Sequence, residues 1–355
     1  SFFNRFPNLN MVSEKKLLYN DKSKNDLLKE LELESFHRLT CSFYRYVKII
    51  NPNSFRDALY EEWSPLKILG RVYVSNEGIN AQISCPYHHW KSYNEKLNLH
   101  KIFKEIPQKF AVEEGNSFHK LVIKVKDQIV AYGINEKEFD MNIVGKHLSP
   151  KEFNSAMNRP ESIVVDMRNY YESEVGCFKG AIVPDVETSR ELLPEIRRLL
   201  KGKEEHEILM YCTGGIRCEK ASSYLIHHGF KNINQLNGGI INYAHHVIKN
   251  NLESQFIGKN FVFDARLGER ITDDVISNCH QCGETSDNHI DCNNDACHIL
   301  FIQCSKCREK YEQCCSIECM EFNKLSLDKQ RILRKDPDQV VSMTRNSASV
   351  KPRLS

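Results

Sequence analysis

One short segment combines residues that can activate a sulfur atom. Cys212 ends an apolar run, and four residues separate it from Arg217, namely Thr213, Gly214, Gly215 and Ile216. A thiolate is the reactive form of cysteine, and a nearby cation or a helix N-terminus stabilises it. Glycines let backbone N–H groups turn toward the sulfur where a side chain would obstruct them. The segment therefore predicts a catalytic cysteine in an anion-binding loop.

The length of this loop limits what it can hold. Protein tyrosine phosphatases have similar loops with one more residue between cysteine and arginine, which makes room for a tetrahedral phosphate. The shorter loop here favours one extra sulfur atom on Cys212, that is, a persulfide. The alternative is an inert buried cysteine in an α/β turn, and the glycines and the arginine argue against it. Cys218 is a candidate resolving thiol, although a residue in the first turn of a helix can also simply pack.

A second concentration of reactive residues lies near the C-terminus. Nine cysteines occur between Cys279 and Cys319, eight of them in four pairs, and Cys314 is left over. A Cys-x-x-Cys turn presents two sulfurs to one tetrahedral ion, and two such pairs complete a structural zinc site. If alternate pairs share a metal, one zinc is held by Cys279, Cys282, Cys304 and Cys307. The second zinc is then held by Cys292, Cys297, Cys315 and Cys319.

Two alternatives to this assignment stay open. The substitute ligands are His280, His289 and His298. The segment could also be reduced and metal-free, and ordered only with a partner. Fourteen cysteines with no apolar signal segment indicate a reducing compartment, so we expect a cytoplasmic location and no disulfide scaffold. No apolar run has membrane-spanning length, and no membrane partner is expected.

The loop cysteine must be positioned by the elements around it, in a domain predicted over residues 145–252. Its expected strands are 162–165, 206–211 and 232–236, and its expected helices are 189–200 and 217–228. Alternating strands and helices indicate a parallel α/β sheet. Ligands of such sheets gather where strands end and helices begin, which is where Cys212 stands.

A domain of a different class is predicted over residues 39–130, after an N-terminal extension of residues 1–38. The expected order is strand, helix, two strands joined by a hairpin, helix and strand, which is the α+β ferredoxin-like pattern. The expected strands are 41–50, 66–74, 81–84 and 119–125. One expected helix begins near 51, and the other spans 88–99. The formal net charge of +2 in 355 residues indicates no general attraction to nucleic acid.

Local charge suggests contact with phosphate near the C-terminus. Residues 253–322 are expected to form a connecting segment and the cysteine-rich module. Residues 323–355 are predicted to be a disordered basic tail without a core. In the connecting segment, Lys259, Arg266 and Arg270 are candidates for phosphate contact, together with the basic tail. Candidates for base stacking are Phe256, Phe261 and Phe263. The alternative is that these phenylalanines are core and these charges solvated.

The α/β segment resembles rhodanese-like domains. Asp166 and Arg168 stand where those domains have an Asp-x-Arg segment, and the resemblance implies a structural ion pair. Cys177 stands where their pattern usually has histidine, so no role of that histidine carries over. Residues 237–241, NGGII, match the Gly-Gly turn after the last core strand.

The chain as a whole resembles the tRNA uridine hydroxylase family. The matching segments include FYRYVKI, GRVYVSNEGINAQIS, MYCTGGIRCEKAS and FIGKNFVFDARLGERI. The resemblance implies an acylphosphatase-like N-terminal domain, a rhodanese domain and a cysteine-rich C-terminal part. It also implies hydroxylation of wobble uridine (U34) in the tRNA anticodon region to 5-hydroxyuridine, with molecular oxygen as co-substrate. Attack of Cys212 on C6 of the uracil would make C5 electron-rich. The alternative function is a sulfurtransferase that passes sulfur from Cys212 to tRNA or to an unknown protein partner.

Overall fold

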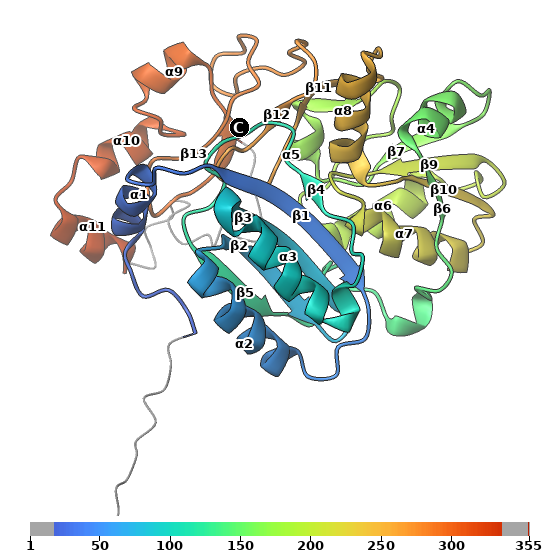
Figure 1. The fold of residues 1–355 in the computed structure, drawn as a ribbon. Helices are drawn as coiled ribbons and strands as arrows, with labels where there is room; N and C mark the ends of the chain where they lie inside the picture. The colour runs from blue at the N-terminus through green and yellow to red at the C-terminus, as the bar shows by residue number, and fades with distance from the viewer. Residues whose placement is uncertain (1–17, 336–353, 355) are drawn as a thin grey trace, which may run out of the picture.

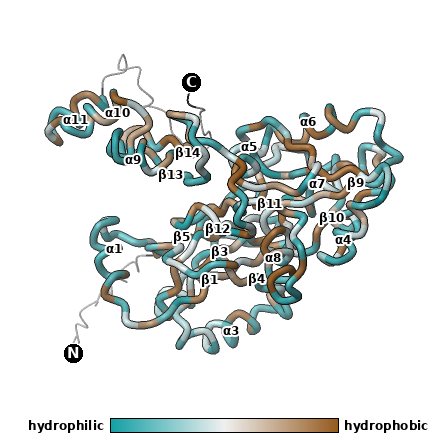
Figure 2. The backbone as a smooth tube through the Cα atoms, turned by 90° about the horizontal axis from the view of Figure 1, so that it is seen from above, coloured by the Kyte–Doolittle hydropathy of each residue, from teal (hydrophilic) through white to brown (hydrophobic). Residues whose placement is uncertain are grey.

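The computed structural model describes residues 18–335 and residue 354. Along the chain it forms an N-terminal α+β domain, a central α/β domain and a small cysteine-rich module, which Figure 2 shows as three groups of elements. Among the described residues, no helix is long and apolar enough to cross a membrane.

The N-terminal domain is a five-stranded sheet in the order β4-β1-β3-β2-β5. Its strands are β1 (Arg38–Tyr46), β2 (Leu69–Ser75), β3 (Gly78–Pro86), β4 (Lys109–Phe110) and β5 (Leu121–Val125). Helices α2 (Pro52–Trp63) and α3 (Trp90–Leu99) cover one face, and α1 (Lys24–Glu32) precedes the sheet (Figure 1). Short 3-10 helices lie at Ser64–Leu66, Tyr87–His89, Lys101–Phe103 and Glu136–Glu138. The predicted helix start near residue 51 is confirmed, because the Asn51 side chain caps α2.

The ferredoxin-like prediction is right in pattern but wrong in its last strand. In that fold the fourth strand lies beside the first, and this place is taken by β4, antiparallel to β1. The strand predicted over 119–125 is β5, which instead pairs parallel with β2 at the opposite edge. The two residues of β4 are too few to show the alternation by which a strand is recognised in sequence.

The central domain is a parallel sheet in the order β6-β10-β9-β7. These strands are β6 (Lys146–Leu148), β7 (Ile163–Asp166), β9 (Glu207–Tyr211) and β10 (Asn232–Leu236). One face packs on α6 (Ser189–Leu199) and α7 (Ile216–His227), and the other on α4 (Pro150–Met157) and α8 (Gly239–Asn250). A short helix, α5 (Tyr170–Ser173), follows β7. The predicted parallel α/β sheet is confirmed.

The connecting segment is built into the central domain by a third sheet. Its strands are β8 (Gly176–Phe178), β11 (Phe256–Asn260) and β12 (Glu269–Arg270). Phe256 and Phe261 are buried, at 0% and 2% exposure, so they offer no stacking surface and the alternative that they are core is confirmed. Their apolar rings are needed to join this segment to the domain, and only Phe263 keeps some exposure.

The three cations of the connecting segment also form ion pairs within the protein. Lys259 and Arg270 both pair with Asp287, at 3.1 and 2.6 Å, and Arg266 pairs with Asp264 and Glu269. Because these acids neutralise the charges locally, the prediction that Lys259, Arg266 and Arg270 hold phosphate is not supported. A count of basic residues could not foresee these partners.

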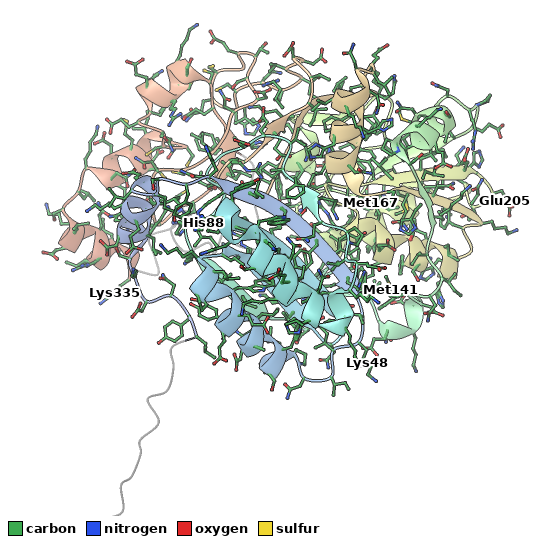
Figure 3. All side chains as sticks on the ribbon, in the orientation of Figure 1. Lys48, His88, Met141, Met167, Glu205 and Lys335 are labelled. Atoms are coloured by element: carbon green, nitrogen blue, oxygen red, sulfur yellow. The ribbon has the colours of Figure 1, made fainter. Side chains whose placement is uncertain are left out.

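The cysteine-rich module consists of short elements. They are β13 (His289–Asp291), β14 (Leu300–Ile302), α9 (Ser305–Lys310), α10 (Ile317–Asn323) and α11 (Leu327–Arg334). Figure 3 places Lys335, which follows α11, and Glu205 of the central domain at opposite ends of the molecule. Helix α11 corrects the prediction of a tail without structure, because Ser326 caps it and Gln330 bonds to the carbonyls of Asn323 and Leu325. The remaining tail cations, Arg345, Lys351 and Arg353, lie outside the described residues.

Candidate active site and metal centres

The loop that carries Cys212 joins the C-terminal end of β9 to the N-terminus of α7. Gly215, with φ of 104°, adopts a left-handed conformation that favours glycine, and its N–H donates to the Cys212 sulfur at 3.1 Å. The loop therefore places the sulfur among backbone donors at the start of a helix, as its sequence predicts.

The surroundings of Cys212 favour its ionised form. Burial by itself would raise the pKa of this thiol. A hydrogen bond from the Cys218 thiol, the charge of Arg217 and the backbone N–H groups of the loop outweigh burial and lower the pKa of Cys212 to about 6. Burial and the neighbouring Cys212 hold the pKa of Cys218 well above its usual value. Cys218 is therefore a protonated donor to the thiolate, and we favour this role over that of a resolving thiol.

Arg217 holds the loop through a carboxylate to which the sequence analysis assigned no role. Its guanidinium forms a two-bonded pair with the buried carboxylate of Glu172, at 2.7 and 2.9 Å, and also donates to the Thr213 hydroxyl at 3.3 Å. Removing one partner of such a pair leaves an uncompensated buried charge. The pair between Arg217 and Glu172 thus ties the loop to α5, and the charge of Arg217 still acts on Cys212.

The Gly-Gly turn at residues 238–239 packs closely against the loop that carries Cys212. Gly239 has φ of 66°, and a Cβ there would lie 2.6 Å from the carbonyl oxygens of both Cys212 and Thr213. Those carbonyls accept hydrogen bonds from the N–H groups of Ile240 and Ile241. The backbone of the Gly-Gly turn therefore sets the position of the cysteine loop.

We expect Gly239→Ala to destabilise the protein by about 3 kcal/mol, because strain at a positive φ is added to a backbone clash. The matched control is Gly229→Ala, since Gly229 has φ of 93° but nothing within 4 Å of the added Cβ. The control should cost only about 1 kcal/mol. Denaturant unfolding measures both, and equal losses would contradict the close contact between the turn and the loop.

The N-terminal domain covers the mouth of the loop. A Cβ on Gly215 would lie 2.9 Å from the Tyr44 hydroxyl, and one on Gly214 would lie 3.5 Å from Cε of Lys109. The Tyr46 hydroxyl donates to the Ile216 carbonyl at 3.0 Å. Cys212 itself has no exposed surface. A substrate therefore reaches the sulfur only when groups that cover it move aside.

Two further ionisable groups border this contact. Glu219, in the first turn of α7, accepts from the Tyr44 hydroxyl at 3.4 Å and pairs with His147 of β6. The hydrogen bond to Glu219 raises the pKa of His147. Burial lowers the pKa of Lys109, and the negative charge of Cys212 acts in the opposite direction. The mouth of the loop is thus lined by groups from both domains. Tyr44 lies within the family segment FYRYVKI, but the sequence analysis assigned no role to Tyr44, Lys109 or His147.

Asp166 and Arg168 of the central domain pair with each other, away from the sulfur. Arg168 and Asp166 form a fully buried ion pair at 2.7 Å, which confirms the implied pairing. The Asp166 carboxylate also accepts from the Tyr211 hydroxyl at 2.6 Å and the Ser173 hydroxyl at 2.9 Å. Cys177 lies in β8, paired with β11. None of these groups contacts the Cys212 sulfur by a described hydrogen bond.

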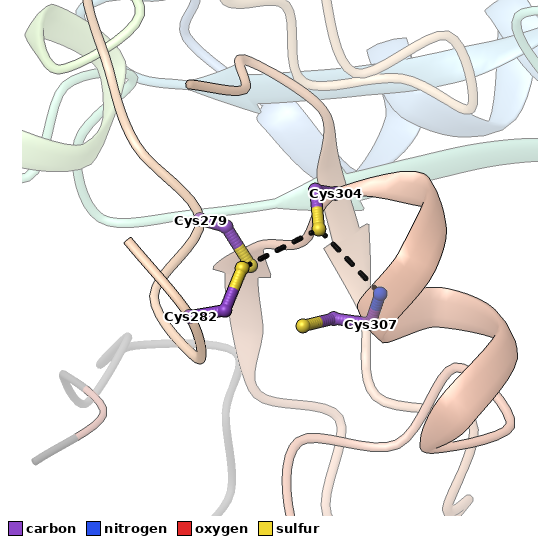
Figure 4. A group of neighbouring side chains, drawn as sticks. All are labelled: Cys279, Cys282, Cys304 and Cys307. Atoms are coloured by element: carbon purple, nitrogen blue, oxygen red, sulfur yellow. Dashed lines mark hydrogen bonds between the residues drawn. The ribbon is translucent and has the colours of Figure 1, made fainter. Parts of the chain in front are cut away.

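The structure brings the eight paired cysteines together in two groups of four. The first group is Cys279, Cys282, Cys304 and Cys307 (Figure 4), and the second is Cys292, Cys297, Cys315 and Cys319. Within each group all sulfurs lie within 4.8 Å of one another, and all eight thiols are free of disulfides. The sulfur atoms of Cys282 and Cys304 are 3.6 Å apart, and those of Cys297 and Cys315 are 3.7 Å apart.

These distances suit a tetrahedral metal. Four thiolates at about 2.3 Å from a zinc ion stand about 3.8 Å from one another, by tetrahedral geometry. Among the histidines considered as substitutes, His280 instead bonds to Glu174 at 2.6 Å, and His289 packs its ring on Phe261. No histidine of the described chain belongs to either group. Cys314 is buried beside the second group, with its thiol directed to the Glu312 carbonyl at 3.8 Å.

Comparison with known proteins accounts for almost the whole described chain. Residues 38–129 match the UPF0176 acylphosphatase-like domain, residues 149–246 the rhodanese-like domain, and residues 257–320 the rhodanese C-terminal family. A tRNA uridine(34) hydroxylase of Leptospira interrogans is 53% identical over 91% of this chain and 88% of its own length. The tRNA uridine(34) hydroxylases of Hamiltonella defensa and Pectobacterium carotovorum are 47% and 46% identical, each over 90% of both chains. The chain therefore belongs to the tRNA uridine(34) hydroxylase family.

Proposed function

We propose that this chain hydroxylates C5 of uridine 34 in the anticodon of tRNA, with molecular oxygen as the source of the new oxygen atom. The observation that supports it best is the Cys212 thiolate, held in a loop at the junction of two domains, in a chain 53% identical to a tRNA uridine(34) hydroxylase. We place the reaction in the cytoplasm, where tRNA is used.

The proposed chemistry begins with the thiolate. Cys212 adds to C6 of the uracil, so that a sulfur–carbon bond forms and C5 becomes electron-rich. C5 then bonds to one atom of O2, while the other atom leaves as water. Forming that water takes two electrons, which a thiol reductant supplies as it is oxidised to a disulfide. Loss of the C5 proton and of the Cys212 sulfur restores the ring. Because uridine 34 lies in a loop, its base can be unstacked for this reaction at moderate cost.

In this proposal, each described group of the site has its own role. Arg217 and Glu172 hold the loop, and Cys218 donates to the thiolate. Glu219 and His147 lie at the loop's mouth, where a base that accepts the C5 proton is required. Zinc in the two cysteine groups would be structural, because each ion would have four thiolate ligands and no open position.

The rival function is transfer of sulfur from a Cys212 persulfide to tRNA. A loop this short suits a persulfide, so the residues alone do not separate the two reactions. Thiolation replaces oxygen with sulfur and gives nearly the same nominal mass gain as hydroxylation, so ordinary mass measurement confuses them.

Labelled oxygen distinguishes the two outcomes. Purified protein is incubated with unmodified tRNA, a dithiol and ¹⁸O₂, and the nucleosides are analysed by high-resolution mass spectrometry. We expect 5-hydroxyuridine that carries the label at position 34. The control is the same reaction in labelled water with unlabelled O2, which should leave the product unlabelled. A sulfur-containing uridine without heavy oxygen would establish the sulfurtransferase instead.

A further inference from the structure

The sheet of the N-terminal domain has one apolar face and one polar face. The apolar face, with Phe43, Val72 and Ile83 among others, packs on helices α2 and α3. On the other face, the strand register aligns two rows of side chains across four strands each. The first row is Lys109, Ser42, Gln82 and Arg71. The second row is Tyr44, Asn80, Tyr73 and Lys124. We call these eight residues the sheet platform.

The composition of the sheet platform is unlike that of a packing surface. None of its eight residues is fully buried, and Arg71 and Lys124 are exposed. It contains two tyrosines, two amides and three cations, and no acidic residue. Lys126, just beyond the second row, lies 5.5 Å from the centre of the Tyr73 ring and adds a fourth positive charge.

Several polar groups of the sheet platform are unused. Among the described residues, the side-chain amides of Asn80 and Gln82 and the Tyr73 hydroxyl have no hydrogen-bond partner, whereas most polar groups at the domain contact are paired. Amide groups of this kind offer both a donor and an acceptor. These donors and acceptors therefore bond to no other part of the described chain.

The sheet platform leads directly to the reactive cysteine. Its Tyr44 and Lys109 end lies against Gly214 and Gly215 of the loop, and the Lys109 ammonium is 4.8 Å from the centre of the Tyr44 ring. Each row crosses three strand spacings, which at about 4.8 Å each is roughly 14 Å. An extended ligand of a few units on the platform would therefore have one end at Cys212.

We propose that the sheet platform binds single-stranded RNA, namely the anticodon-loop nucleotides beside the target uridine. This inference rests on the proposed function and names the surface that holds its substrate. Aromatic rings on the face of a sheet stack bases, amides bond to base edges, and lysine and arginine contact phosphates. The sheet platform has all three, with Arg71 also donating to the Phe263 carbonyl at 3.3 Å. In the connecting segment, by contrast, Phe256 and Phe261 are buried and the cations are in ion pairs.

The stacking role is tested by Tyr73→Ala and its matched control Tyr73→Phe. The probe is an anticodon stem-loop RNA with uridine 34, and its affinity is measured by fluorescence anisotropy without O2. Loss of one stacked base costs roughly 1–3 kcal/mol, so we expect Tyr73→Ala to weaken binding about tenfold. Tyr73→Phe keeps the ring, and should bind within about twofold of the wild type. Circular dichroism verifies that both variants are folded.

The charge role is tested by the double variant Arg71→Ala/Lys124→Ala. Each lost phosphate contact should reduce the dependence of log affinity on log salt by about 0.7, so the slope should fall by about 1.4. Arg198→Ala/Lys201→Ala removes the same charge from the central domain and should leave the slope unchanged. Ultraviolet crosslinks are expected on peptides from β2 and β3.

The outcomes separate this inference from the proposed function. Unchanged affinity and salt slope in the platform variants would overturn the sheet platform, even if the wild type produces 5-hydroxyuridine. A change of slope in the Arg198/Lys201 control alone would overturn it as well, as would failure of the wild type to bind the RNA. If the RNA binds through the platform but no hydroxylated product forms, the inference about binding stands and the proposed reaction is wrong.

Discussion

Cys212→Ser is expected to reduce hydroxylation of tRNA below detection, at least about 10³-fold, while the protein stays folded. Serine is nearly isosteric, but its hydroxyl does not ionise near neutral pH and cannot act as the nucleophile. The Gly215 N–H and the Arg217 charge that favour a thiolate would then face a neutral oxygen. The measurement is the yield of 5-hydroxyuridine per tRNA in single-turnover reactions.

Cys218→Ser and Cys218→Ala are the matched controls for this prediction. Serine keeps a donor beside Cys212, so activity should fall only modestly. Alanine removes the donor, which should raise the pKa of Cys212 and shift the pH profile upward. Normal activity in Cys212→Ser would contradict the mechanism, and complete loss in Cys218→Ser would restore the idea of a resolving thiol.

The pH profile follows from the same thiolate. Because the pKa of Cys212 is lowered to about 6, the reactive form dominates above pH 6 and is lost as the pH falls through that value. The profile of kcat/KM should therefore show an acidic limb near pH 6 in the wild type. In Cys218→Ala that limb should move to higher pH. An acidic limb near the ordinary value of a cysteine, above 8, would show that the loop does not stabilise the thiolate.

The cysteine-rich module is expected to contain about two zinc ions per chain and to unfold when they are removed. Its own hydrophobic core is small, with Ile290, Ile299 and Phe301 among its few large apolar side chains. Structural zinc in small domains contributes roughly 10–16 kcal/mol of apparent binding free energy, which becomes folding free energy. Without zinc, eight thiolates or thiols would be left facing one another in two clusters.

Single substitutions test the two sites separately. Cys279→Ser and Cys319→Ser should each lower the zinc content by about one ion and raise hydrogen exchange in residues 279–319. Cys314→Ser is the matched control, because Cys314 is buried in the same module but belongs to neither group, so two zinc ions should remain. Elemental analysis of protein purified without chelator gives the stoichiometry. A folded, active preparation without stoichiometric metal would contradict the prediction.

The sequence alone was informative where the relevant contacts are local. The strand, Cys212, the two glycines and Arg217 lie within a dozen residues, so their types and order predict a loop at a helix N-terminus. The spacing of the cysteines likewise indicates that the two residues of each pair share one ion, whereas the alternate combination of pairs was only a conditional assignment until the structure brought those cysteines together. The parallel orientation of the strands in the central sheet follows from the alternation of strands and helices.

Long-range contacts were decided only by the tertiary structure. Glu172 pairs with Arg217 across 45 residues of chain, and Lys109 and Tyr44 reach the loop from another domain. The place of β5 beside β2, rather than beside β1, depends on hydrogen bonds between separate strands. Neither residue types nor periodicity encode such pairings in a form that can be read along a single chain.

For surface residues too, the sequence indicates the residue types, and packing decides which of them are accessible. The sequence presents Phe261 and Arg270 as an aromatic and a cation near one another, but packing buries the first and Asp287 neutralises the second. Tyr73 and Lys124 are unremarkable in their own strands, and they share a face only because β2 and β5 pair in that register. Short-range order thus determined the reactive groups of this protein, whereas strand register and domain packing decided which groups face a substrate, because burial and charge neutralisation arise between segments distant along the chain.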